Sequence, residues 1–179
     1  MKEKLRIIAS KYLYCGKIIN LRYDDIEIGN NLAAREIVEH PGGAAALAVK
    51  QGYIYLVRQY RHPYCDDVLE VPAGKIEKGE DPGQTIIREL QEEVGIFAAK
   101  LEPAGLLYPS PGYTDEVIHL FYTEEFSVSA YQRLDPDECL DIALYKAEEV
   151  YRMIESGEIT DAKTLVLLLK YKKRILGLN

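Results

Sequence analysis

The sequence predicts an α/β domain preceded by a small antiparallel β-sheet. Strand-like segments come first, one capped amphipathic helix then lies between further strands, and two helical segments end the chain. This order is typical of a layered α/β domain. With 179 residues, 47% of them hydrophobic and 28% charged, the chain is long enough to bury one main core beside a small addition.

The first forty residues form a separate β-sheet region in this interpretation. The expected strands are Leu5–Ala9, Lys17–Ile28 and Leu32–Glu39, with Gly29-Asn30-Asn31 as a turn. So few residues do not enclose a core of their own, so their apolar face must be covered by the main domain or by a second copy of the chain. We therefore divide the chain into residues 1–40 and a main domain of residues 41–179.

The main domain begins with a strand, Ala44–Val49, whose small apolar residues are typical of a strand buried on both faces. The polar segment Ser127–Glu138 is expected to be a loop. In the last helix, Leu165, Leu168 and Leu169 are expected to point inward. The other expected strands are Tyr53–Tyr60, Val68–Val71, Leu101–Tyr108, Val117–Thr123 and Leu140–Tyr145, and the C-terminal helices are Ala147–Ser156 and Asp161–Leu176.

A single helix between these strands has clear end signals. Asp81 is suited to cap its N-terminus, Pro82 suits the first helical position, and Gln84 completes a pair resembling a capping box. The helix should run to about Val94 and end at Gly95. Its apolar stripe, expected to pack on the core, consists of Ile87, Leu90 and Val94, with Ile86 beside it.

The same helix carries a cluster of carboxylates. Glu89 and Glu93 are four residues apart and share a face, Glu92 lies one position round, and Arg88 is placed to form an ion pair with Glu92. Gathered carboxylates repel each other, so a hard divalent cation such as Mg²⁺ is the natural occupant. The alternative is a solvated acidic helix face, which is the usual meaning of a charge run.

The whole stretch from Gly74 to Ile96, GKIEKGEDPGQTIIRELQEEVGI, resembles a complete Nudix box. The fixed positions are filled by Gly74, Glu80, Arg88, Glu89, Leu90, Glu92, Glu93, Gly95 and Ile96. The resemblance implies an α/β/α sandwich around a mixed sheet, a loop-helix-loop metal site, and hydrolysis of a nucleoside diphosphate linked to another moiety. By position, it assigns Mg²⁺, with Mn²⁺ as a substitute, to Glu89 and Glu93, with Glu92 and the carbonyl of Ala73 as further ligands. Arg88 and Glu80 would hold the loop and helix together.

A loop beyond the box extends the resemblance to one branch of the family. Pro111 lies sixteen residues past Gly95, and the segment around it resembles the loop that marks ADP-ribose pyrophosphatases. The likeness includes the N-terminal strands, Gln59-Tyr60-Arg61, Glu70 to Gly74 and Asp161 to Thr164. From its residues alone, a loop with two prolines and a glycine is equally suited to be a rigid turn.

Relatives in that branch are homodimers with exchanged N-terminal strands, and the resemblance assigns substrate contacts to Arg35, Arg61, Glu70 and Pro111. Arginine suits phosphate recognition because its planar fork bonds two oxygens at once. The alternatives are that Arg35 pairs with Glu36 or Glu39 at the surface and that Glu70 is an ordinary strand residue. For the general base, the resemblance favours Glu138, and Glu92 is the competitor.

The expected activity is hydrolysis of ADP-ribose to AMP and ribose 5-phosphate. The alternatives are another nucleoside diphosphate sugar such as GDP-mannose, a dinucleoside polyphosphate, or a non-catalytic module that binds ADP-ribose. The net charge of −7 argues against nucleic acid or an anionic membrane as partner. The absence of a signal-like apolar run and the odd, widely spaced cysteines Cys15, Cys65 and Cys139 favour the cytoplasm.

Overall fold

The computed structural model describes residues 5–129 and 140–178. Its contacts divide the chain into two compact units. The first unit ends at Gly42 and also includes Tyr108–Val117, and the second comprises Gly43–Leu107 and the chain from Ile118 onward. The smaller unit therefore takes in a loop that comes from far along the sequence.

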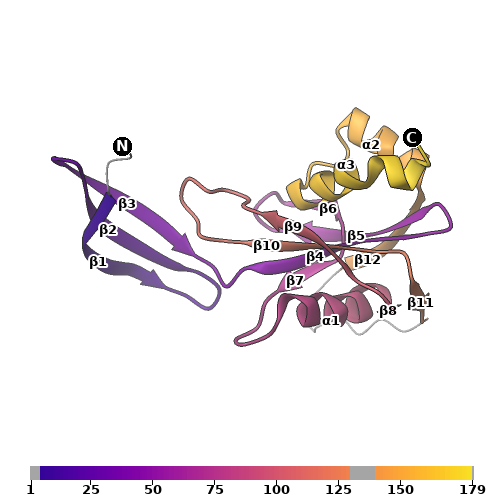
Figure 1. Cartoon of the computed structure of the whole chain (residues 1–179), viewed down its shortest axis with the longest axis horizontal. Coiled ribbons are helices and arrows are strands. Elements are labelled where there is room, and N and C mark those ends of the chain that lie inside the picture. Colours follow the sequence, from indigo (N-terminus) through magenta and orange to yellow (C-terminus); the bar gives the residue numbers. More distant parts are fainter. Residues whose placement is uncertain (1–4, 130–139, 179) are drawn as a thin grey trace. The chain divides into compact units, whose positions relative to one another are not determined.

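The first unit is an antiparallel sheet of three strands, β1 (Leu5–Cys15), β2 (Asn20–Ile28) and β3 (Asn31–Glu39), in the order β1-β2-β3 (Figure 1). Strand β1 continues well past the predicted end at Ala9, and β2 begins three residues later than predicted, because Gly16 N–H donates to Ile19 C=O at 2.9 Å and closes a turn between them. Every residue of β1 is exposed, so the strand has no buried face. Its sequence therefore lacks the alternation of apolar and polar residues from which the length of a strand is predicted.

The loop Tyr108–Val117 is fastened to the end of β3. Val38 N–H donates to Tyr113 C=O at 2.8 Å, and Asp115 N–H donates to Val38 C=O at 3.2 Å. The Asp115 carboxylate also accepts the His40 N–H at 2.9 Å. These bonds hold the loop and the strand as one unit, which the sequence did not indicate.

The second unit contains a seven-stranded mixed sheet. Its path is β12-β5-β4-β10-β9, with β6 paired to β5 and β7 to β4, and only β4 and β10 are parallel. The strands are β4 (Gly43–Lys50), β5 (Tyr53–Arg61), β6 (Asp66–Glu70), β7 (Ala73–Lys75), β9 (Glu102–Leu107), β10 (Ile118–Thr123) and β12 (Leu140–Lys146); a separate pair is β8 (Ile96–Ala98) with β11 (Phe126–Val128). Strand β11 overlaps the segment that was expected to be a loop.

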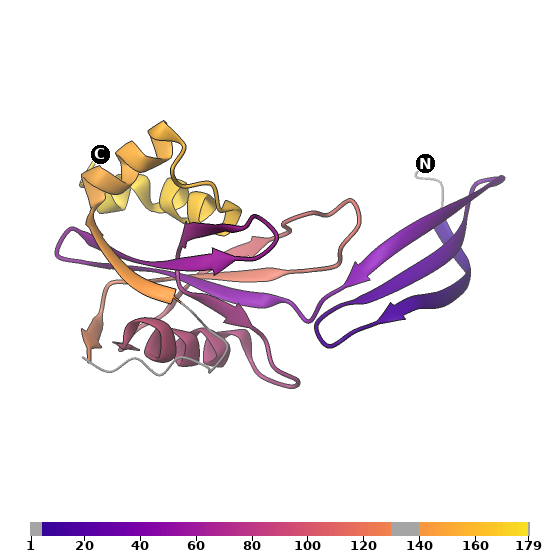
Figure 2. The same cartoon turned by 180° about the vertical axis from the view of Figure 1, so that it is seen from behind.

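Helix α1 (Pro82–Val94) covers one face of this sheet, and α2 (Ala147–Ser156) and α3 (Ala162–Leu176) cover the other (Figures 1 and 2). Alternate residues of β4 enter two different cores: Ala44, Ala46 and Ala48 pack with α1, whereas Ala45 and Leu47 pack with α2 and α3. The predicted α/β/α sandwich is therefore confirmed. Within the described residues, no helix has both the length and the apolarity to cross a bilayer.

Two residues predicted to point inward do not. Ile87 and Leu169 are exposed, while the adjacent Ile86 and Leu168 are fully buried. In α1 the buried face is turned by one residue because it also contains Glu89 and Glu93. The helix thus packs two carboxylates, as well as its apolar residues, toward the sheet.

Candidate active site

Helix α1 has the ends that the sequence predicts. The Asp81 side chain caps the first turn by accepting the Gly83 N–H at 2.8 Å, and Pro82 occupies the first helical position. At the other end Gly95 adopts φ of 65°, a left-handed conformation that favours glycine, and donates to Gln91 C=O at 3.2 Å. These two caps thereby fix the length of the helix.

Two buried carboxylates of α1 converge on the backbone at the start of β7. Glu89 is 6% exposed and Glu93 only 1%. The Glu93 carboxylate accepts the Ala73 N–H at 3.1 Å. A Cβ placed on Gly74 would lie only 1.7 Å from Oε1 of Glu89, so this carboxylate occupies the space that a side chain at position 74 would take. Burying two carboxylates so close together is costly without a positive partner.

Arg88 forms ion pairs with three carboxylates of the box. Its guanidinium donates to both oxygens of Glu80 at 3.2 Å, to Glu89 Oε1 at 2.8 Å and to Glu92 Oε2 at 3.0 Å. The predicted ion pair with Glu92 is present, and the bonds to Glu80 link the loop before the helix to the helix itself. One arginine therefore connects three carboxylates.

These contacts predict that the acid stability of the unit depends on Glu80. Hydrogen bonds from Arg88 and Thr85 lower the pKa of Glu80 from 4.5 to about 2. A lowered pKa means that the ionised form stabilises the fold above pH 4.5 and that this contribution is lost as the pH falls toward 2.

We expect Glu80→Gln to flatten the pH dependence of the free energy of unfolding between pH 5 and pH 2.5, as measured by urea denaturation. Glu125→Gln is the matched control, because Glu125 is exposed and forms only a 3.6 Å ion pair with Lys100. An unaltered pH slope in the Glu80 variant would contradict this role.

A second charged group lies where β5, β6 and the start of α3 meet. Arg61 donates through Nε and Nη2 to the two oxygens of Glu70, both at 2.6 Å. Lys163 donates to the same Glu70 carboxylate and to Asp161 at 3.0 Å. Glu70 is 3% exposed, so it is not an ordinary surface strand residue. Lys163 was not among the predicted site residues, although a lysine in the first turn of a helix is unfavourable for the helix dipole and is a signal visible in the sequence.

Arg35 and Pro111 lie together in the first unit, where β3 and the Tyr108–Val117 loop line a cavity of about 310 Å³. Arg35 donates to Ala34 C=O at 2.7 Å. Within the described residues it forms no ion pair with Glu36 or Glu39, and Glu39 is instead bonded to Arg22. The surface ion pair considered as the alternative for Arg35 is therefore not seen.

The carboxylates of the box are candidate ligands for a metal ion. Within residues 5–129 and 140–178, no three His, Cys, Asp or Glu side chains gather closely enough to hold one by themselves. Arg88 binds both Glu89 and Glu92, while Glu93 is bonded to Ala73. Two buried carboxylates on one turn still fit Mg²⁺, which prefers one or two carboxylates completed by water and substrate phosphate. Glu138 lies outside the described residues.

Comparisons with known proteins find relatives over most of the chain. The model of the NUDIX domain matches residues 39–168. An ADP-ribose pyrophosphatase of Bacillus subtilis is 44% identical over 162 residues, which cover 89% of this chain and 88% of that protein. A methanol dehydrogenase activator of Bacillus methanolicus is 37% identical over 90% of this chain and 89% of its own length. A solved structure described as an ADP compounds hydrolase matches the fold with a TM-score of 0.85 at 18% identity, over 99% of this chain and 97% of that one.

Proposed function

We propose that this chain, which belongs to the NUDIX family, is a Mg²⁺-dependent hydrolase that splits ADP-ribose into AMP and ribose 5-phosphate. The observation that carries the proposal is the convergence of the buried Glu89 and Glu93 carboxylates on the Ala73–Gly74 backbone. The choice of ADP-ribose is supported by the 44% identity to a protein named for that activity.

Glu89 and Glu93 would hold the metal ion, with Glu92 and the Ala73 carbonyl as further ligands, and Mn²⁺ would be an alternative ion. When bound, the ion neutralises the diphosphate and lowers the pKa of water. The chain's own part is to fix these oxygens before substrate arrives: Arg88 ties Glu89 and Glu92 to Glu80, and Ala73 N–H orients Glu93. Such prior orientation is what makes electrostatic stabilisation effective.

The water would give its proton to Glu138 or, as the competing candidate, to Glu92. Glu92 is about one third exposed and already accepts a hydrogen bond from Arg88 at 3.0 Å. Because that bond already occupies one oxygen of Glu92, Glu138 is our choice for the base.

Arg61 and Glu70 would contact the substrate in the second unit, and Arg35 and Pro111 would do so through the cavity that they line in the first. GDP-mannose, another nucleoside diphosphate sugar and dinucleoside polyphosphates remain the alternative substrates. A non-catalytic module that binds ADP-ribose is disfavoured, because every carboxylate of the box is retained. The exposed free thiols of Cys15 and Cys65 support a reducing compartment, the cytoplasm.

A substrate panel tests the proposal directly. ADP-ribose, GDP-mannose, UDP-glucose, NADH and diadenosine polyphosphates are incubated with the protein and Mg²⁺, and alkaline phosphatase releases phosphate from monoester products. We expect kcat/KM for ADP-ribose to exceed that for the others by about tenfold or more. A different leading compound would overturn the substrate, and survival of all compounds would favour the binding module.

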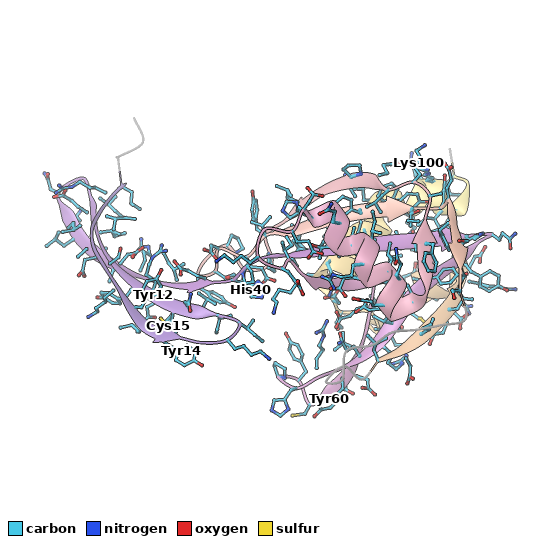
Figure 3. The ribbon with its side chains drawn as sticks, turned by 90° about the horizontal axis from the view of Figure 1, so that it is seen from below. Tyr12, Tyr14, Cys15, His40, Tyr60 and Lys100 are labelled. Atoms are coloured by element: carbon cyan, nitrogen blue, oxygen red, sulfur yellow. The ribbon has the colours of Figure 1, made fainter. Side chains whose placement is uncertain are left out.

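We also propose a homodimer with exchanged N-terminal strands. Strand β1 is an edge strand whose large apolar side chains are at least half exposed on both faces: Leu5, Ile7, Ile8, Tyr12, Leu13 and Tyr14. Figure 3 shows Tyr12 and Tyr14 projecting from this sheet. A long apolar edge left in water is an aggregation hazard unless a partner covers it.

Sedimentation equilibrium at low micromolar concentration is expected to give twice the chain mass of 20.3 kDa. Leu13→Lys should shift the protein toward monomer, because it places a charge in the covered apolar surface. The control is Arg6→Lys, which keeps the charge of an exposed residue farther along β1. A monomeric wild-type protein would rule out the exchange of strands and any shared site.

A further inference from the structure

Lys163 occupies a position that is unfavourable for a lysine in two respects. It is the second residue of α3, where the helix dipole disfavours a positive charge, and it is only 8% exposed. Lysine is almost never buried to this degree unless it is paired. A local cost of this kind is typical of residues kept for a role at a site.

An ion pair with Glu70 offsets this cost, and Glu70 in turn binds Arg61. Both Glu70 and Arg61 are proposed substrate residues. Lys163 shares the Glu70 carboxylate with Arg61, so one buried anion lies between two cations. Burial by itself would raise the pKa of Glu70, but the hydrogen bonds from Arg61 and the charge of Lys163 outweigh it and lower that pKa. Glu70 is therefore ionised at neutral pH and holds the Arg61 fork in one orientation.

The arrangement leaves part of Arg61 available to a ligand. Its Nε and Nη2 groups are taken by Glu70, whereas Nη1 has no hydrogen-bond acceptor in the described part of the chain. The side chain is 39% exposed. Asp161 also pairs with Lys163, so the two cations and two carboxylates of this group sum to zero charge, and without Lys163 they would carry one net negative charge.

The start of α3 also holds the backbone that leads into the box. Asp161 caps the helix by accepting from Thr164 N–H at 2.9 Å, and Thr164 Oγ1 in turn accepts the Val71 N–H at 2.9 Å. Two residues further on, Ala73 N–H donates to Glu93. Lys163 and Thr164 thus secure both the side chain of Glu70 and the segment between it and Ala73.

We propose that Lys163 is a positioning residue for substrate recognition: it offsets the Glu70 and Asp161 carboxylates, so that Arg61 stays fixed in direction and the group around it carries no net negative charge that would repel the diphosphate. This inference rests on the proposed function, because it assumes that Arg61 contacts the diphosphate. Lys163 itself touches no substrate in this proposal.

Kinetics of the full-length protein test the role. Lys163→Met keeps the aliphatic stem and removes the charge, so we expect KM for ADP-ribose to rise about tenfold while kcat changes less than about twofold. Lys163→Arg restores a charge and should bring KM back to within about threefold of wild type. The matched control is Lys170→Met, which removes the same charge from the same helix. In the described part of the chain, Lys170 donates to Ala104 C=O at 2.5 Å and forms no ion pair.

A compensating variant separates charge from packing and serves if Lys163→Met folds poorly. Asp161→Asn combined with Lys163→Met returns the summed charge of this group to its wild-type value of zero, and asparagine still caps α3, so KM should return toward the wild-type value. An unchanged KM in Lys163→Met, equal damage in the Met and Arg variants, or no recovery in the double variant would each overturn the proposal. Each variant is assayed on the diphosphate that the wild-type protein cleaves best, so a wild-type protein inactive on ADP-ribose refutes only the proposed function.

Discussion

Glu93→Gln is expected to lower the turnover of ADP-ribose by at least about a hundredfold while the protein stays folded. Glutamine has the same shape, and its carbonyl oxygen can still accept the Ala73 N–H that Glu93 accepts at 3.1 Å. What is lost is a negative charge that is 1% exposed and aimed at the proposed metal position. Because we propose that this charge would act on a bound ion, and through it on the diphosphate, kcat should fall and the Mg²⁺ concentration needed for half-maximal activity should rise.

Steady-state kinetics over a range of Mg²⁺ concentrations, with thermal unfolding followed by circular dichroism, would measure both effects. Glu125→Gln makes the same chemical change at an exposed residue and should leave turnover unaltered. Turnover near the wild-type value in Glu93→Gln would eliminate the metal assignment. A melting temperature no lower than wild type would fit, since removing a buried charge relieves its desolvation cost.

Local signals predicted the box and its helix well. The cap at Asp81 and the stop at Gly95 depend only on neighbouring residues, so the ends of α1 were readable from the sequence. The rotation of the helix was not, because Ile86 and Ile87 are adjacent and either can begin an apolar stripe. Its true face is decided by the sheet, which takes Ile86 and both buried carboxylates and leaves Ile87 in solvent.

Short and exposed elements were harder to predict. Strands β7, β8 and β11 have three residues each, too few for a period to be seen, and β1 has no buried face to create one. The contact of Lys163 with Glu70 spans 93 residues and depends on α3 packing beside β6. The sequence places Lys163 in the first turn of a helix, but only the tertiary structure shows that Glu70 is the carboxylate it binds.

Gly74→Ala is expected to reduce turnover by roughly ten- to a hundredfold without unfolding the protein. The new Cβ would lie 1.7 Å from Oε1 and 2.0 Å from Cδ of Glu89, so that carboxylate has to move. Gly74 is not among the glycines with positive φ, so alanine suits its backbone and the cost falls on the end of a flexible side chain. The free energy of unfolding should fall by less than about 2 kcal/mol. The Glu89 carboxylate, in contrast, would leave the position at which it is proposed to hold the metal ion.

A double-variant experiment shows whether Glu89 transmits this effect. If Gly74→Ala acts by displacing the carboxylate, it should cost little further activity in a Glu89→Ala background, because the group it displaces is already gone. Gly83→Ala is the control, since its Cβ would approach only Asp81 Oδ1, at 3.0 Å. A Gly74 variant as active as wild type, or one that loses the same factor with and without Glu89, would contradict the role given to Gly74. A glycine here is then required not for a turn but for the room it leaves to a carboxylate.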